Sequence, residues 1–167
     1  MSEMNLAANK QAVIILDMIK GYGWLPGSYG YEMVARVRDL KDAAYAAGVQ
    51  VIHVQSMRRP TDNNGENKNF PNTSDIEVIP ELQPVDKDIL IYKRFLGGFT
   101  QNDLDYTMRC LGIERVILAG ASTDNCVLWT AADAHQLTQG GLVTETRRLL
   151  ASDRFTADVE SFFSELY

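Results

Sequence analysis

Three side chains that could act together in nucleophilic catalysis each follow a short apolar run. Asp17 comes after AVIIL, Lys93 after DILIY, and Cys126 after RVILA and a polar turn. A carboxylate can accept a proton, a thiol can attack a carbonyl carbon, and an ammonium can stabilise the negative charge of both. The set predicts cysteine-based acyl transfer, provided that the fold brings the three residues together.

Each of the three residues also has a plainer explanation. An Asp after a strand often caps a turn, a Lys in such a place is usually solvated, and a free Cys is among the most buried residue types. Chance explains any one of these residues more readily than it explains the occurrence of all three reactive types at the ends of three apolar runs.

The segment around Cys126 fits two interpretations equally well. The apolar run 116–119 stops at Gly120, a polar stretch follows, and a helical pattern begins near the cysteine. A helix N-terminus has unpaired N–H groups and the positive end of the dipole, which would lower the pKa of the thiol and could hold an oxyanion. The other interpretation is a small cysteine packed under the helix.

Strand-like and helix-like patterns alternate along the chain. Apolar runs predict strands at 12–16, 49–54, 88–92 and 115–119, with a weaker one at 142–146. Helical spacing predicts helices at 31–47, 100–111, 124–139 and 155–166, with Thr100 as the N-cap of the second. This alternation favours a three-layer α/β/α fold with a mostly parallel sheet of five or six strands. Ligands bind at the carboxyl ends of such strands, where the three reactive residues would lie.

Length and composition limit the class of protein. The 167 residues predict a single domain over 1–167, with 1–10 as a flexible tail. A net charge of -6 argues against nucleic-acid binding and gives no reason to expect a membrane partner. The polar N-terminus lacks a signal core, so we expect a cytoplasmic protein whose two cysteines are reduced thiols. No cofactor is expected, and no Cys/His cluster has zinc-ligand spacing.

The stretch 56–80 is rich in Asn, Asp, Gly and Pro and is predicted to be mostly loop. A loop of this length in a compact domain often serves as a lid, a binding loop or an oligomer contact. A surface insertion without such a role is an almost equal alternative.

Three segments make the chain resemble the isochorismatase-like cysteine hydrolases. They are VIILDMIKGYG around Asp17, IYKRFLGGFTQNDLDYTMRCLGI around Lys93, and LAGASTDNCVLWTAADAHQLTQGG around Cys126. The resemblance covers residues 12–143, and the second and third segments are specific in order and spacing. It implies the isochorismatase-like fold, and dimers or tetramers are usual in families of this kind.

The resemblance also implies an Asp17–Lys93–Cys126 triad. Cys126 would attack an amide-type carbonyl and form a thioester, releasing ammonia or an amine, and water would then release the acid. Asp17 would accept the thiol proton and later help to activate water, while Lys93 would stabilise both charges. The family has a cis peptide that corresponds here to Ala121-Ser122. It would turn the backbone N–H of Ser122, with that of Cys126, toward the oxyanion.

Aromatic residues near the triad positions are expected to form a small, partly apolar substrate pocket. For any one of them, core packing is the commoner role. The set is Tyr22, Trp24, Phe95, Phe99 and Trp129.

The chain departs from the family in two places. The nicotinamidase branch has a metal site of Asp and His after the second strand, but here His53 lies within the strand pattern and no second His follows before His135. We therefore expect neither a metal site nor nicotinamidase activity. Arg58 and Arg59 stand in this region and could bind a substrate carboxylate or phosphate, or lie in a solvated loop or a subunit contact. The chain also ends soon after the fifth strand, which puts a sixth strand in doubt.

Three functions remain open. The first is a hydrolase of the amidohydrolase type that cleaves a C–N bond of a small amide, ureido or carbamoyl compound through a thioester on Cys126. The second is an isochorismatase-type enzyme that cleaves a vinyl ether with Asp17 as the acid. The third is a catalytically idle homologue that serves in binding or assembly.

Overall fold

A five-stranded parallel sheet lies between helices in the computed structural model, which describes residues 8–28, 30–62, 69–137 and 143–144. The strands are β1 (Gln11–Leu16), β2 (Gln50–Ser56), β3 (Ile89–Lys93), β4 (Arg115–Gly120) and β5 (Val143–Thr144), in the spatial order β3-β2-β1-β4-β5. All four pairings are parallel. The predicted α/β fold and its five strands are thereby confirmed.

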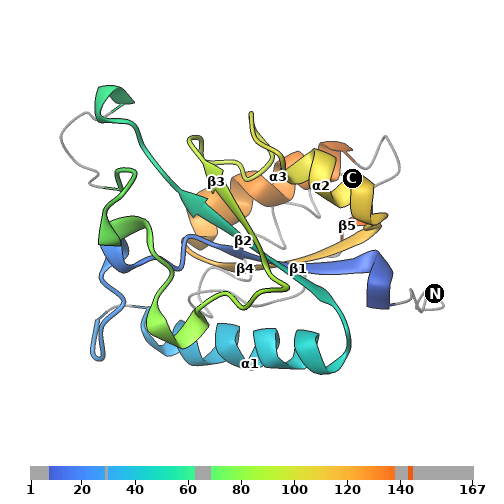
Figure 1. The fold of residues 1–167 in the computed structure, drawn as a ribbon, viewed down its shortest axis with the longest axis horizontal. Coiled ribbons are helices and arrows are strands. Elements are labelled where there is room, and N and C mark those ends of the chain that lie inside the picture. The colour runs from blue at the N-terminus through green and yellow to red at the C-terminus, as the bar shows by residue number, and fades with distance from the viewer. Residues whose placement is uncertain (1–7, 29, 63–68, 138–142, 145–167) are drawn as a thin grey trace.

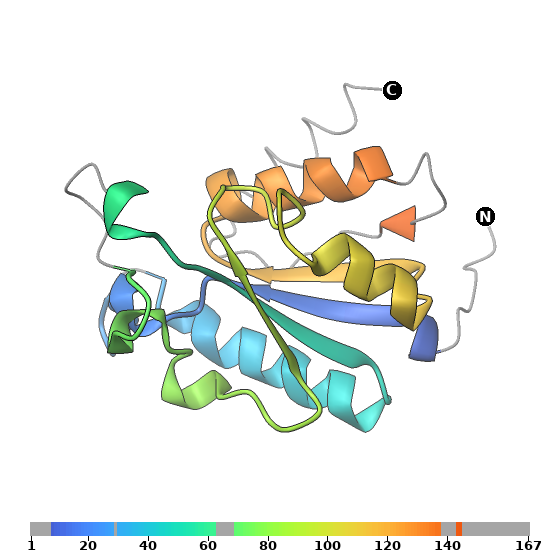
Figure 2. The ribbon, with the colours of Figure 1, turned by 45° about the horizontal axis from the view of Figure 1, so that its top comes forward.

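Helices cover both faces of the sheet, as Figures 1 and 2 show. One face carries α1 (Glu32–Ala46), and the other carries α2 (Leu104–Leu111) and α3 (Leu128–Leu137). The central strand β1 alternates between the layers: Ile14 and Leu16 pack with α2 and α3, while Val13 and Ile15 pack with α1. A strand covered on both faces must be apolar throughout, which explains the run AVIIL.

The outer strand β3 is covered less completely than the sequence pattern suggests. Its residues Leu90 and Tyr92 are exposed, whereas Ile91 and Lys93 are buried. A continuous apolar run such as 88–92 suggests a strand covered on both faces, but β3 is an edge strand of the described sheet and only the face with Ile91 and Lys93 is buried.

Several predicted boundaries shift. The helix predicted at 100–111 begins only at Leu104, because turns occupy the preceding residues and the Asn102 carboxamide oxygen accepts a hydrogen bond from the Leu104 N–H at 2.9 Å. Thr100 is therefore not the N-cap, and its hydroxyl instead contacts Asp133. In the supposed tail, residues 8–10 form a 3-10 helix held by an ion pair between Lys10 and Glu114.

The long stretch 56–80 combines loop with short helical turns. Ser56 belongs to β2, and 3-10 turns span Pro60–Asp62 and Ser74–Ile76. Val78 forms an antiparallel bridge with Ile19, just beyond β1. The turns gather beyond the carboxyl ends of β1 and β2, at the left of Figure 1. The helix predicted at 155–166, a sixth strand and the end of the helix at 124–139 lie outside the described residues.

No helix in the described part of the chain is long and apolar enough to cross a membrane.

Candidate active site

Asp17 occupies the first position after β1 and is completely buried. Its backbone is left-handed, with φ of 56°, and its N–H donates to the Val54 carbonyl at 3.1 Å. The side chain then turns back to the sheet, where Oδ1 accepts a 2.6 Å hydrogen bond from the Ser56 N–H. Among the described residues, none donates a hydrogen bond to the other oxygen, Oδ2. The site thus contains a fixed carboxylate with one acceptor oxygen available.

Lys93 is the last residue of β3 and one of the most buried side chains of the protein, at 1% exposure. Its Nζ lies 2.9 Å from Asp17 Oδ2 in an ion pair and 3.2 Å from Cys126 Sγ. It also donates to Ser56 Oγ at 3.0 Å and to the Phe95 carbonyl at 3.1 Å. The solvated lysine that would have explained this position is excluded, because the ammonium is enclosed by four partners.

The turn after β4 brings Cys126 to the same point. Gly120 ends the strand with φ of 117°, and a Cβ there would lie 2.1 Å from the Leu16 carbonyl oxygen, so only glycine fits. The Ala121–Ser122 peptide bond is cis. A π-helical turn, Thr123–Val127, then leads into α3, and Cys126 is its fourth residue. The cysteine is therefore at the start of a helical segment, as predicted, where the first N–H groups have no intrahelical acceptor.

The resting thiol is not the lowered-pKa cysteine that its place in the sequence predicts. Burial and the nearby charge of Asp17 together raise the pKa of Cys126 to about 12, and Lys93 only partly opposes them. For Lys93, burial lowers the pKa, but the charges of Asp17 and Cys126 raise it above its usual value. A neutral thiol next to an Asp–Lys ion pair is the form that these charges favour at neutral pH.

Two glycines hold the segment after Lys93 against α3. The Gly98 N–H donates to Thr130 Oγ1 at 2.8 Å, and that hydroxyl donates to the Cys126 carbonyl at 2.6 Å. A Cβ on Gly97 would lie 2.0 Å from Asp133 Oδ2, and one on Gly98 would lie 2.9 Å from the Thr130 side chain. The pair Gly97-Gly98 therefore permits the close approach that sets Lys93 relative to Cys126.

A cavity of about 290 Å³ opens above these residues. Cys126 reaches it, while Asp17 and Lys93 lie beneath and are not part of its lining. The lining residues are Tyr22, Trp24, Ser56, Arg58, Leu96, Ala121, Ser122, Asn125 and Cys126. They are mostly uncharged, with Arg58 as the charged exception.

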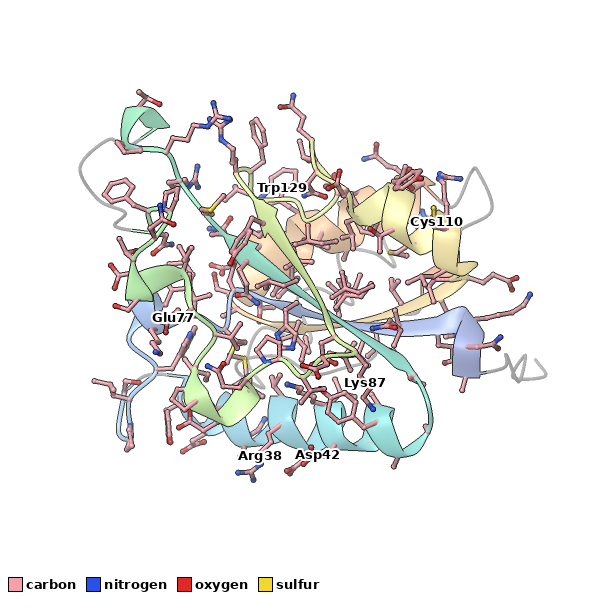
Figure 3. All side chains as sticks on the ribbon, in the orientation of Figure 1. Arg38, Asp42, Glu77, Lys87, Cys110 and Trp129 are labelled. Carbon is pink, nitrogen blue, oxygen red and sulfur yellow. The ribbon has the colours of Figure 1, made fainter. Side chains whose placement is uncertain are left out.

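Two of the five predicted pocket aromatics, Tyr22 and Trp24, line the cavity. Burial and the charge of Asp17 raise the pKa of the Tyr22 phenol, so it is a neutral donor at physiological pH. The other three do not line it. Phe99 is buried in the core between the sheet and the helices α2 and α3. Phe95 and Trp129 are about half exposed, and Figure 3 shows Trp129 at the outer side of α3.

Ser56 is a site residue that sequence reasoning missed. Its N–H holds Asp17, its Oγ accepts from Lys93, and it also lines the cavity. The sequence signal that could have found it was the extension of the second apolar run by two residues, which makes Ser56 the last residue of a strand beside β1. Asn125, the residue before Cys126, also lines the cavity and was not predicted to do so.

The second cysteine and the metal-site region lie elsewhere. Cys110 is exposed on α2, well apart from the carboxyl ends of the strands in Figure 3. His53 is buried in β2 and does not line the cavity. In the part of the chain that the structure describes, no group of three or more His, Cys, Asp or Glu side chains is placed to hold a metal ion.

The amino-acid sequence matches a known protein family. Residues 11–138 match the family model described as the isochorismatase domain. The ureidoacrylate amidohydrolase RutB of Agrobacterium fabrum is 28% identical over 177 residues, covering 85% of this chain and 77% of that protein.

Solved structures agree with this match. A cysteine hydrolase from Pseudomonas syringae pv. phaseolicola is 27% identical with a TM-score of 0.71, covering 80% of this chain and 70% of that one. The N-carbamoylsarcosine amidase from Thermoplasma acidophilum has a TM-score of 0.80, and the match covers 95% of this chain and 92% of that one. Its sequence identity is 24%, so this likeness supports the fold alone.

Proposed function

The chain belongs to the isochorismatase family, and on that premise we propose that it is a cysteine hydrolase that cleaves a C–N bond of a small amide, ureido or carbamoyl compound. It is a hydrolase of the amidohydrolase type, as its amidohydrolase and cysteine-hydrolase relatives indicate. The observation on which the mechanism rests is the contact of one buried ammonium with both Asp17 and Cys126, at 2.9 and 3.2 Å, beneath the cavity.

In the first step, Cys126 Sγ attacks the substrate carbonyl carbon while its proton passes to Asp17. The raised pKa of the thiol means that it needs a base at the moment of attack. Asp17 Oδ2 lies 2.9 Å from the Lys93 ammonium, which also contacts Cys126 Sγ, and as a carboxylate oxygen it has a further lone pair that can accept that proton. Its other oxygen stays fixed by the Ser56 N–H, so the carboxylate does not have to reorient.

The carbonyl oxygen becomes negatively charged as the carbon–sulfur bond forms. We assign its stabilisation to the backbone N–H groups of Ser122 and Cys126, because both residues line the cavity at the start of a helical segment. The tetrahedral intermediate then collapses to a thioester, and the leaving nitrogen takes the proton held by Asp17.

A water molecule completes the cycle. The oxygen of the water attacks the thioester carbonyl carbon while Asp17 accepts a proton from the water. The sulfur leaves as a thiolate, which then takes this proton from Asp17. Lys93 stabilises the thiolate and the carboxylate in turn, since its Nζ contacts both. The products are the acid and the free thiol of Cys126.

Mass spectrometry of the protein after incubation with small amides, ureido and carbamoyl compounds, and with an aldehyde inhibitor, tests this proposal. A thioester or thiohemiacetal is expected on Cys126. Cys126→Ala should abolish both the adduct and turnover while leaving the fold intact. Cys110→Ala is the matched control, because that thiol is exposed on α2 and should form no such adduct.

Two outcomes would contradict the proposal. Turnover that survives Cys126→Ala but not an Asp17 substitution would favour the vinyl-ether chemistry. No adduct and no turnover with any compound of the panel would favour a binding or assembly role.

A further inference from the structure

We propose that Arg58 forms an anion subsite in the cavity and that the substrate carries a carboxylate in addition to its scissile C–N bond. This inference rests on the proposed function and specifies its substrate class. Arg58 lines the same cavity as Cys126, and hydrolysis through a thioester on Cys126 makes no use of its side chain.

Among the described residues that line the cavity, Arg58 alone has a formal charge. Asp17 and Lys93 lie below the cavity and neutralise each other in their ion pair. The other lining side chains are the hydroxyls of Ser56 and Ser122, the carboxamide of Asn125, the phenol and indole of two aromatics, and apolar groups. A cavity whose described lining has one cation and no anion favours an anionic ligand.

The guanidinium of Arg58 is held in place yet retains donors for a ligand. Its Nη1 donates to the Arg94 carbonyl at 2.8 Å, and its own backbone N–H donates to the Asn69 carbonyl at 2.7 Å. No carboxylate among the described residues forms an ion pair with it. Arginine has five N–H donors in a planar fork, so one bond to a carbonyl leaves the geometry needed for a bidentate carboxylate.

Lys93 is not available for this role. Its three N–H groups donate to Ser56 Oγ, the Phe95 carbonyl and Cys126 Sγ, which uses every donor of an ammonium. The substrate's carboxylate therefore has one charged partner in the cavity, and that partner is Arg58. The volume of about 290 Å³ holds roughly ten water molecules, which limits the substrate to a small acid.

Matched substrate pairs test the subsite. N-carbamoylglycine and isobutylurea share the ureido group, and the second replaces the carboxylate by an uncharged isopropyl group with the same number of heavy atoms. Succinamic acid and 4-methylpentanamide form the equivalent pair of amides. In whichever of the two pairs is hydrolysed faster, we expect the native protein to favour the acid over its neutral partner. The expected difference in kcat/KM is roughly 10- to 100-fold, mainly through KM.

Arg58→Gln should remove that preference by lowering kcat/KM for the acid and leaving the neutral partner almost unchanged. Arg58→Lys keeps the positive charge but loses the planar fork of donors. Its preference for the acid should lie between that of the native protein and that of Arg58→Gln. Arg59→Gln is the matched control, because the neighbouring arginine is exposed and does not line the cavity. It should leave the preference intact.

Binding of the same compounds to Cys126→Ala protein, measured by calorimetry, separates the two proposals. A preference for acids that disappears in the Arg58→Gln, Cys126→Ala double variant supports the subsite even if no thioester ever forms. Thioester formation with equal rates for acid and neutral partner would overturn the subsite and leave the proposed function standing. Equal loss of both partners in Arg58→Gln would also overturn it, since Arg58 would then only support the Arg94 turn.

Discussion

The part of the chain that the structure describes contains two buried lysine–aspartate pairs with different surroundings. Lys93 and Asp17 meet at the carboxyl ends of the strands, 2.9 Å apart. Lys41 of α1 and Asp88, just before β3, meet on the α1 face of the sheet at 3.5 Å, close to the buried His53. In Figure 3 the second region lies between α1 and the segment that contains Lys87.

The two pairs differ in how their charges are satisfied. Lys41 donates to the carbonyls of Leu82 and Gln83, and Asp88 Oδ2 accepts from the Tyr45 hydroxyl and the Val85 N–H. These bonds tie α1 to the chain between β2 and β3. In contrast, the Lys93 pair has a thiol beside it and a cavity above it. Burial of an ion pair is therefore not sufficient for a site, because a reactive partner and access for a ligand are needed as well.

The pKa shifts of the two lysines go in opposite directions. Burial lowers the pKa of Lys41, and Asp88 does not fully compensate. For Lys93, burial acts in the same direction, but Asp17 and Cys126 together raise its pKa above the usual value. The Asp17 carboxylate, joined by Cys126 whenever the thiol loses its proton, keeps the proton on Lys93. We therefore expect Lys93 to stabilise negative charge during a reaction without releasing its own proton.

The largest expected effect comes from Asp17→Asn. Turnover should fall by roughly 1000-fold because the base is lost. At the same time, alkylation of Cys126 by iodoacetamide should become faster, because the charge of Asp17 raises the pKa of the thiol while Lys93 lowers it. Peptide mapping after timed alkylation measures the second effect. Asp88→Asn, the matched change in the other pair, should alter neither rate, and slower alkylation in Asp17→Asn would contradict this account.

Asp88→Asn should instead reduce stability. It leaves the Lys41 ammonium, whose side chain is 5% exposed, without a counter-charge, and breaking a buried pair from one side costs about 3 kcal/mol. Urea unfolding measures the loss. Asp42→Asn serves as the control, because Asp42 lies on the exposed side of the same helix. If both variants unfold at the same urea concentration as the native protein, the Lys41–Asp88 pair does not support the fold.

The next effect is a loss of stability in weak acid that depends on His53. Burial lowers the pKa of His53 to about 4, and the nearby charge of Lys41 acts in the same direction. Between pH 6.5 and 4 the unfolded chain binds a proton that the folded protein excludes, so stability should fall as pH falls through this range. The total is about 3 kcal/mol. His53→Gln should flatten the profile of unfolding free energy against pH, and an unchanged slope would exclude His53 as its origin.

The smallest expected effect is that of Ser56→Ala. The hydroxyl accepts one of the three hydrogen bonds of Lys93, so its removal should lower kcat by about tenfold while the Ser56 N–H still holds Asp17. Ser56→Thr keeps the hydroxyl and should restore most of the rate. Equal rates for the native and Ala proteins would show that Ser56 is only part of the lining.

Much of the fold could be predicted from the sequence because apolar periodicity is a local property. The runs ending near Asp17, Lys93 and Gly120 each became a parallel strand, and the helix predicted at 31–47 is α1 to within one residue at each end. The start of α2 was predicted wrongly, because turns occupy the residues before Leu104 and Thr100 contacts Asp133 of α3, a residue more than thirty positions away in the chain.

The order of strands and helices could be predicted from the amino-acid sequence alone, as could the three reactive residue types at the ends of the strands. Both follow from patterns a few residues long. Three other features emerged only once the chain was folded: Ser56 joins Asp17 to Lys93, the pKa of Cys126 is raised rather than lowered, and three of the predicted aromatics do not line the cavity, namely Phe95, Phe99 and Trp129. These features depend on burial and on distances between residues far apart in the chain, which no local pattern records.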